Sequence, residues 1–383
     1  MTAPEAAVWC QSPLLLAAVL PSGALAGLLL ARGVGRLLPP PPPGAPKTGR
    51  WPLAARVAPA VMAAATAAVW WWEIRMLGQI PAAVAGVDCV VLWLRLAAHL
   101  ILASLLAAAA WVDLEERVIP DAITVPGVLA GLAWNALLPA TLLPVGRTVS
   151  RSFAPPLIEP DVLGGFGPLH DVGLPGWLCG PAGLALMAAI FAVWWWFGMP
   201  PARPDGRPDA PADPRLIRLG LIVAAAGGFG LTIAWLAGGD HWAGLVTALL
   251  GLLVAAGIIW ATRAGASRAL GREAMGFGDV TLMAMAGSWL GWQACLLACL
   301  LAVFIGLIHG VTQLLRHSES ELPFGPSLCL GLGLVVIAWR PIWTASAPQF
   351  ERPLEMGLVV AVVIVMTALT LWAWSRLRGG FQA

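Results

Sequence analysis

Long hydrophobic runs, rather than an alternation of apolar and polar positions, make up most of the chain. Seven stretches of 20 to 36 residues contain no Asp, Glu, Lys or Arg, and a helix needs about 20 apolar residues to cross a bilayer. Three weaker stretches lie near residues 53–72, 88–112 and 325–340. The pattern predicts an all-α fold, a polytopic transmembrane bundle of roughly ten or eleven hydrophobic helices.

The longest of these runs, residues 280–315, exceeds the length of one straight crossing. Gly287 and the Gly291-Trp292 pair interrupt it, and glycine weakens a helix interior while it permits turns. We expect a short helix, a turn and then a long helix that ends at Leu315.

Proline-rich segments divide the chain. Residues 38–51 contain five consecutive prolines and predict a short, stiff cytoplasmic linker. Two longer segments, residues 144–175 and 199–217, are rich in proline, glycine or charge. They cannot bury enough apolar area to form membrane helices. The predicted organisation is a region of N-terminal helices and linker (1–84), a membrane domain (85–375) with insertions at 144–175 and 199–217, and a cytoplasmic tail (376–383).

The composition excludes a soluble enzyme with an ordinary surface. Charged residues are 11% of the chain and the mean hydropathy is +0.83, whereas soluble domains carry about 25% charged residues.

The distribution of positive charge predicts the orientation in the membrane. With the N-terminus placed outside, 16 of the 22 Lys and Arg fall in inner loops, as the positive-inside rule requires. They are spread over many loops, so no nucleic-acid partner is expected. Trp clusters at the ends of apolar runs, as at Trp70–Trp72, predict contact with membrane lipids at the interface.

Two carboxylates stand at the predicted inner ends of apolar helices. Ionisable residues at membrane depth are costly and are therefore functional candidates. Asp113 follows the apolar run that ends AAAAWV, and Asp279 precedes the run VTLMAMAG. Both should lie near the cytoplasmic face at a similar depth.

The residues after Asp113 predict a helix end and a new helix start. Pro120 disfavours helical backbone at the preceding residue, so the helix that carries Asp113 should end before Ile119. Asp121 then caps the next helix. An alternative interpretation of Asp113 is a solvated charge at a helix end, beside Glu115.

Gly276 and Gly278 precede Asp279 in the sequence MGFGD. Glycine permits a close backbone approach, which would let an extended peptide reach the carboxylate. The alternative is that Asp279 only caps a helix, because Asp is a preferred N-cap residue.

Considered as a pair, the two aspartates favour peptide hydrolysis. Two carboxylates in a site of low dielectric constant share a proton, so one can take a proton from water while the other gives one to the scissile carbonyl. The five histidines are scattered, without metal-ligand spacing, and no nucleophile elbow, Walker or dinucleotide motif is present. We therefore expect no metal and no cofactor.

In three motifs the chain resembles the prepilin peptidases, the type IV leader peptidases among the GxGD aspartic membrane proteases. The motifs are the D-x6-P-D stretch from Asp113 to Asp121, the MGFGD box that ends at Asp279, and ELPFGPSLCLG at 321–331. The resemblance implies that Asp113 and Asp279 are the catalytic aspartates.

The resemblance also implies a substrate and a place of action. The partners would be the basic leader peptides of type IV prepilins or pseudopilins, cleaved after a glycine at the cytoplasmic face of the bacterial inner membrane. Pro323, Gly325 and Pro326 would form a tight turn near the same face. The sequence does not indicate an oligomeric state.

Two departures from the family pattern bear on activity. Many members carry a domain with two CxxC pairs that bind zinc, and they also methylate the new amino terminus. Residues 33–52 contain no cysteine, which predicts no zinc site and leaves N-methylation doubtful. Thr281 stands where the family often has lysine, which allows a reduced activity or an altered substrate.

Two other functions remain open. A transporter or channel-like protein would use the aspartates for ion coupling or helix capping, and a non-catalytic relative would only bind pilins or assembly partners. Arg95 and His99 lie one helical turn apart in a predicted span; we assign them to lipid head groups or to Asp88 rather than to catalysis.

Overall fold

The computed structural model describes Ser12 and residues 15–38, 50–80, 89–143, 174, 176–198, 214–315, 324–350 and 353–380. These residues form helices and no strand, which confirms the all-α prediction. The chain divides into two compact units. The first comprises Met1–Ile123, Leu143–Pro155 and Leu297–Ala345, and the second comprises Thr124–Leu142, Pro156–Leu296 and Ser346–Ala383.

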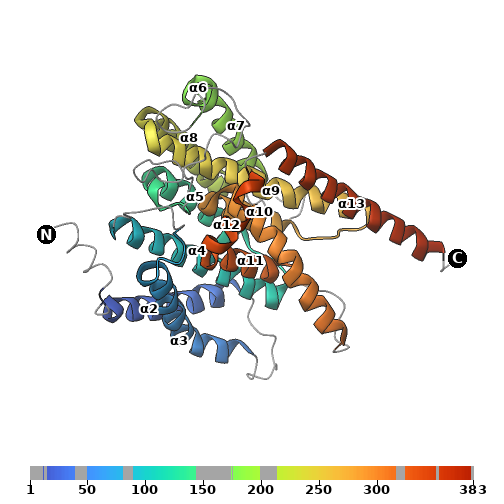
Figure 1. The fold of residues 1–383 in the computed structure, drawn as a ribbon, viewed down its shortest axis with the longest axis horizontal. Coiled ribbons are helices and arrows are strands. Elements are labelled where there is room, and N and C mark those ends of the chain that lie inside the picture. Colours follow the sequence, from blue (N-terminus) through green and yellow to red (C-terminus); the bar gives the residue numbers. More distant parts are fainter. Residues whose placement is uncertain are drawn as a thin grey trace. The chain divides into compact units, whose positions relative to one another are not determined.

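The helices of the described residues follow one another along the chain (Figure 1). They are α2 (Leu16–Leu37), α3 (Arg50–Trp70), the π-helical turn η2 (Trp71–Arg75), α4 (Cys89–Glu116), α5 (Asp121–Leu137), the 3-10 turn η3 (Pro139–Thr141), α6 (Gly176–Cys179), α7 (Pro181–Gly198), α8 (Pro214–Ala237), α9 (Gly239–Leu270), α10 (Phe277–Leu315), α11 (Gly325–Ile337), α12 (Trp339–Phe350) and α13 (Pro353–Gly380).

Seven of the described helices are long and apolar enough to cross a membrane, or eight spans result if α11 and α12, bent by 94°, count as one. The protein is thus a polytopic helical membrane protein, as predicted. Some of the predicted hydrophobic helices, α5 among them, are shorter than the spans that pass this test. The outside position of the N-terminus stays a prediction.

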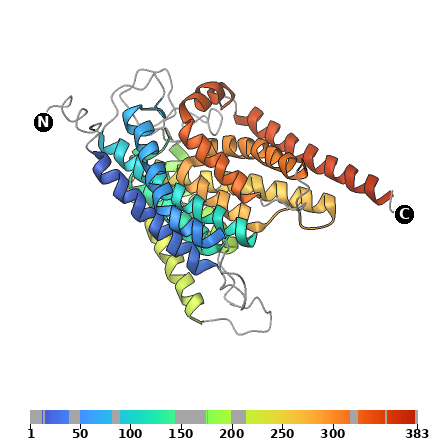
Figure 2. The ribbon, with the colours of Figure 1, turned by 90° about the horizontal axis from the view of Figure 1, so that it is seen from below.

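In the first unit, α2 and α3 lie side by side and both contact α4 (Figure 2). A buried apolar cluster that includes Val19, Trp70 and Leu96 joins these helices. Because Trp70 is fully buried, it is a core residue, and the sequence-based assignment of this side chain to the lipid interface was wrong.

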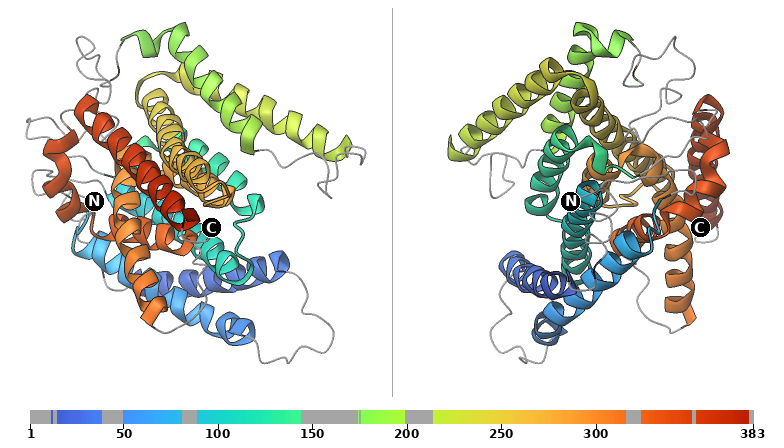
Figure 3. Two further views of the ribbon diagram at one scale, coloured as in Figure 1. Left: turned by 90° about the vertical axis from the view of Figure 1, so that its right-hand side faces the viewer. Right: turned by 60° about the vertical axis from the view of Figure 1, so that its left-hand side comes forward.

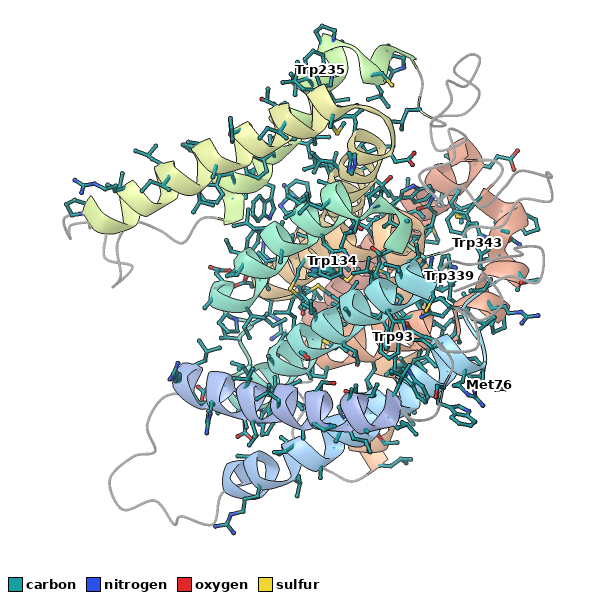
Figure 4. All side chains as sticks on the ribbon, turned by 90° about the vertical axis from the view of Figure 1, so that its left-hand side faces the viewer. Met76, Trp93, Trp134, Trp235, Trp339 and Trp343 are labelled. Carbon is teal, nitrogen blue, oxygen red and sulfur yellow. The ribbon has the colours of Figure 1, made fainter. Side chains whose placement is uncertain are left out.

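Two further tryptophans of this unit, Trp339 and Trp343, lie one helical turn apart on α12, with their ring centroids 5.1 Å apart (Figure 4).

In the second unit, α7 and α8 pack against each other and against α9, while α13 lies along α9 (Figure 3). Hydrogen bonds from two indole groups join the short helix α6 to α8 and α9. Trp235 on α8 (Figure 4) donates from Nε1 to the Cys179 carbonyl at 2.8 Å, and Trp242 on α9 donates to the Leu178 carbonyl at 2.9 Å. These bonds satisfy the last carbonyls of α6, which lack donors within the helix.

Helix α10 is broken at Gly291, as the sequence predicted. This residue has φ 78° and ψ 173°, a conformation that only glycine adopts readily. At such a break the carbonyls of the preceding turn lose their intrahelical donors. The side-chain amide of Asn135, on α5, supplies a donor in their place: its Nδ2 donates to the Ser288 carbonyl at 2.7 Å and lies 3.3 Å from the Trp289 carbonyl.

The Asn135→Leu variant should lower the free energy of unfolding by about 1–3 kcal/mol, because the Ser288 carbonyl would stay buried without its donor. Reversible unfolding in mixed detergent micelles measures this change. Thr232→Val is the control: the exposed Thr232 hydroxyl donates only to the Gly228 carbonyl of its own helix, and we expect a change within about 0.5 kcal/mol. Equal stability of the Asn135→Leu and parent proteins would contradict the role given to this amide.

Some helix ends agree with the sequence-based prediction and others differ. The prediction that the helix of Asp113 ends before Ile119 is confirmed, since α4 ends at Glu116 and α5 begins at Asp121. α8 begins at Pro214, inside the predicted insertion 199–217, because proline suits the first position of a helix. α13 continues to Gly380 and so includes most of the predicted tail. Residues 39–49, 144–173 and 199–213 lie outside the described residues.

Candidate active site

Asp113 lies in the last turn of α4, and its side chain is buried, with a residue exposure of 6%. The helix is rich in Leu and Ala, which favour helical backbone. It ends because Arg117 adopts left-handed backbone with φ 57° and donates its N–H to the Asp113 carbonyl at 2.9 Å, a common way to close a helix. Local sequence therefore places a carboxylate at the end of an apolar span.

The Asp113 side chain meets the beginning of α11. Gly325, the first residue of this helix, directs its backbone N–H at the carboxylate. A Cβ atom at Gly325 would overlap Asp113 Oδ2 and would lie 3.0 Å from Ile119 Cδ1, so glycine is required for this approach. The first turn of a helix offers unbonded N–H groups and the positive end of the dipole to a carboxylate.

One oxygen of this carboxylate has no hydrogen bond to the part of the chain that the structure describes. Asp113 Oδ2 is buried and has no hydrogen-bond partner among the described residues. Buried polar atoms are nearly always bonded, and an exception requires an explanation such as a catalytic role. The site therefore presents an oriented carboxylate with one acceptor position available to water or to a peptide.

Asp279 lies in the first turn of α10 and is also buried, at 7% exposure. The preceding helix α9 stops where Gly271 adopts left-handed backbone, φ 67°, and the turn then leads into the MGFGD motif. Thr281 donates from Oγ1 to the Gly278 carbonyl at 3.0 Å. The hydroxyl of Thr281 thus stabilises the turn that carries Asp279. This is the position at which the family that the sequence resembles often has lysine.

Arg263 of α9 contacts the residues that lead into the MGFGD motif. Its Nε donates to the Met275 carbonyl at 2.8 Å, its guanidinium pairs with Glu273, and its Cζ lies 5.8 Å from the centre of the Phe277 ring. Gly276 is exposed, and a Cβ there would find only the Gly278 nitrogen, at 3.9 Å. The motif is therefore anchored on one side and open at Gly276.

The predicted site residues gather in two groups. Gly325 contacts Asp113 in the first unit, with Pro326 buried beside it in sequence, and Gly276 and Gly278 lead into Asp279 in the second unit. Pro120 lies between α4 and α5, and Asp121 is the first residue of α5. Pro323 lies outside the described residues. The interpretation of residues 323–326 as only a turn missed the contact of Gly325 with Asp113.

No three His, Cys, Asp or Glu side chains in the described part of the chain gather where they could hold a metal ion. The expectation that the protein needs no metal and no cofactor stays a prediction.

Residues 214–311 match the model of the type IV leader peptidase family. This range contains α8, α9 and most of α10, and it includes Asp279. No solved structure matches the chain.

Several curated proteins named prepilin leader peptidase/N-methyltransferase are similar to parts of the chain. The protein from Stutzerimonas stutzeri is 37% identical over 149 residues, which cover 38% of this chain and 46% of the relative. That from Pseudomonas aeruginosa is 43% identical over 83 residues, 21% of this chain and 28% of the relative. That from Escherichia coli is 35% identical over 96 residues, 24% of this chain and 43% of the relative.

The chain thus spans less than half the length of these three relatives. The three relatives nevertheless carry the same name, and the range that matches the family contains the MGFGD motif. The resemblance noted in the sequence is confirmed: residues 214–311 match the type IV leader peptidase family.

Proposed function

We propose that the protein is an aspartic endopeptidase of the bacterial inner membrane that cleaves the basic leader peptides of type IV prepilins or pseudopilins. The observation that carries this proposal is the buried Asp113 carboxylate, whose Oδ2 has no hydrogen-bond partner within the described residues. A buried polar atom without a partner costs about 1–3 kcal/mol. Such a cost at membrane depth is typical of a functional site. The second aspartate of the proposal, Asp279, lies within the residues that match the family.

In this proposal Asp113 and Asp279 act as a pair on the scissile peptide. The ionised carboxylate takes a proton from water while the water oxygen bonds to the carbonyl carbon, and the protonated carboxylic acid donates to the carbonyl oxygen. In the second step the carbon–nitrogen bond breaks: the leaving nitrogen takes the proton that the first carboxylate received from water, and the other carboxylate regains a proton from a hydroxyl of the tetrahedral intermediate. Two carboxylates that share one proton are suited to these two roles. The N–H of Gly325 orients the Asp113 carboxylate.

The position of Asp113 at the cytoplasmic face is supported by the other end of α4. Cys89, the first residue of the helix, is disulfide-bonded, and disulfides persist on the oxidising side of a membrane. A helix rises 1.5 Å per residue, so Asp113 lies about 36 Å farther along α4, about the thickness of a bilayer. The excess of Lys and Arg in the predicted inner loops favours the same orientation.

We further propose that the peptidase domain extends over residues 85–375, beyond the range of the family match, because both Asp113 and Gly325 belong to it. Residues 1–84 would contribute the accompanying helices α2 and α3. The named relatives are also N-methyltransferases, but methylation is not part of the proposal, because residues 33–52 contain no cysteine.

A cleavage assay with the purified full chain tests this function. The substrate is a synthetic peptide with a basic leader, a glycine and the first residues of an apolar helix. We expect cleavage after the glycine, identified by mass spectrometry, and no cleavage when that glycine is replaced by valine. Proton-dependent transport in proteoliposomes without cleavage would instead favour a transporter, and peptide binding without cleavage would favour a non-catalytic relative.

A further inference from the structure

Four buried polar side chains in the first unit form a network that the proposed reaction does not use. Glu73 belongs to η2, Gln79 follows it, and Arg95 and His99 lie on α4; their exposures are 3%, 1%, 1% and 6%. We call them the Glu73 cluster. His99 Nδ1 lies 2.8 Å from Glu73 Oε1, and Arg95 interacts electrostatically with Glu73. Their burial shows that the assignment of Arg95 and His99 to lipid head groups was wrong; Asp88, the alternative partner, lies outside the described residues.

The cluster has a defined arrangement of donors and acceptors. Gln79 Nε2 donates to Glu73 Oε1 at 2.8 Å. A carboxylate oxygen accepts hydrogen bonds, so we assign the donor role in the 2.8 Å contact with Oε1 to His99 Nδ1. Both bonds end on one oxygen, so the glutamate fixes the orientation of the amide and of the imidazole together.

Gln79 and the neighbouring Trp72 connect this cluster to the end of α11. Gln79 Nε2 also donates to the Val336 carbonyl at 2.8 Å, and Trp72 Nε1 donates to the Ile337 carbonyl at 2.6 Å. α11 ends at Ile337, where the chain bends by 94° into α12. The last carbonyls of a helix lack intrahelical donors, and in an apolar environment such groups require partners. The two side chains supply them.

Helix α11 is therefore held at both of its ends. Gly325 at its start meets Asp113 near the end of α4, and Val336 bonds to Gln79, which lies 3.3 Å from His99 in the middle part of α4. The two helices pack together, and these contacts show that they run antiparallel. The contacts of α11 are about 17 Å apart along its axis. A helix is stiff over this length, so a shift at Val336 also moves Gly325.

We propose that Gln79, oriented by Glu73, and Trp72 are positioning residues that fix the end of α11 and so hold Gly325 against the Asp113 carboxylate. The proposal rests on the peptidase function proposed above. These residues act on the reaction through α11, whose first N–H orients the carboxylate that activates water.

The buried charges point to positioning rather than to stability alone. Removing charged groups from water costs free energy that their attraction often fails to recover, and well-packed apolar residues frequently stabilise as much. A directional network differs from apolar packing because it specifies one arrangement. The donors of Gln79 and Trp72 reach the carbonyls of Val336 and Ile337 in one register of α11 and not after a displacement along the axis.

Two variants of the full chain test the proposal. Gln79→Met removes the amide with little change in volume, and Trp72→Phe removes the indole donor and keeps a smaller aromatic ring. We expect kcat for leader cleavage to fall by about tenfold or more with KM within about twofold, because small displacements of catalytic groups are costly in rate. We also expect faster hydrogen–deuterium exchange in peptides from residues 324–337.

The matched control is Ser104→Ala, which removes a hydrogen bond of Ser104 Oγ to the Leu100 carbonyl within α4; both readouts should equal those of the parent. If Gln79→Met does not fold, Trp72→Phe decides. A normal kcat, or a lowered kcat without faster exchange at 324–337, overturns the proposal. If the parent cleaves no leader peptide, the peptidase function fails, whereas the exchange measurement still tests whether these residues hold α11.

Discussion

Asp113→Asn and Asp279→Asn each lower kcat for leader cleavage by at least about 10³-fold, because asparagine can neither take a proton from water nor donate a carboxylic proton. Asparagine keeps the shape of the side chain, so the protein should remain folded. The measurement is the initial rate of peptide cleavage by the purified variants, with product identified by mass spectrometry and folding checked by thermal unfolding in detergent.

Two exposed acidic residues provide the controls. Glu115 is exposed in the same turn of α4 as Asp113, and Asp240 is exposed at the start of α9. Glu115→Gln and Asp240→Asn should retain kcat within about twofold, since exposed charges of this kind have small effects. Leader cleavage that persists in both Asp113→Asn and Asp279→Asn would refute the proposed pair and leave the two aspartates as helix-end residues.

Gly325→Val lowers kcat by about 10²-fold or more while the protein stays folded. The new Cβ would overlap Asp113 Oδ2, so either α11 or the carboxylate must move, and a displacement of about 1 Å at a catalytic group costs about 10²-fold in rate. Steady-state kinetics on the leader peptide, measured beside thermal unfolding, separates this effect from a loss of fold.

Gly333→Val, on the same helix, is the matched control. A Cβ at Gly333 would meet no atom within 4 Å, so the variant should keep the kcat of the parent. Gly325→Ala is the smaller change and should give an intermediate loss. Full activity of Gly325→Val would show that the close approach of α11 to Asp113 has no part in catalysis.

The helix limits could be predicted where a single residue type determines the backbone. Pro120 set the end of α4, and Gly291 set the break in α10, because proline and glycine act through their own covalent geometry. The two aspartates could be singled out because so few charged residues stand at the ends of apolar runs. None of this required knowledge of which helices are neighbours.

Contacts between helices could not be predicted in the same way. Gly325 and Asp113 are far apart in the sequence, and nothing in the sequence around either one indicates the other. Glu73 was overlooked because it follows three tryptophans and precedes Arg75, a composition that is typical of a membrane interface. Its partner His99 was noticed, but hydropathy alone does not show which face of a helix is buried against protein and which faces lipid.

The contacts at both ends of α11 have a consequence for how its length can vary between homologous chains. Inserting or deleting one residue inside a helix rotates everything beyond it by about 100° and shifts it by about 1.5 Å. Gly325 and Val336 could then no longer both meet their partners. We therefore expect the number of residues between them to be constant among homologues, whereas loops tolerate insertions. A homologue with a different spacing should have lost either the glycine at its aspartate or the polar residues at the opposite end.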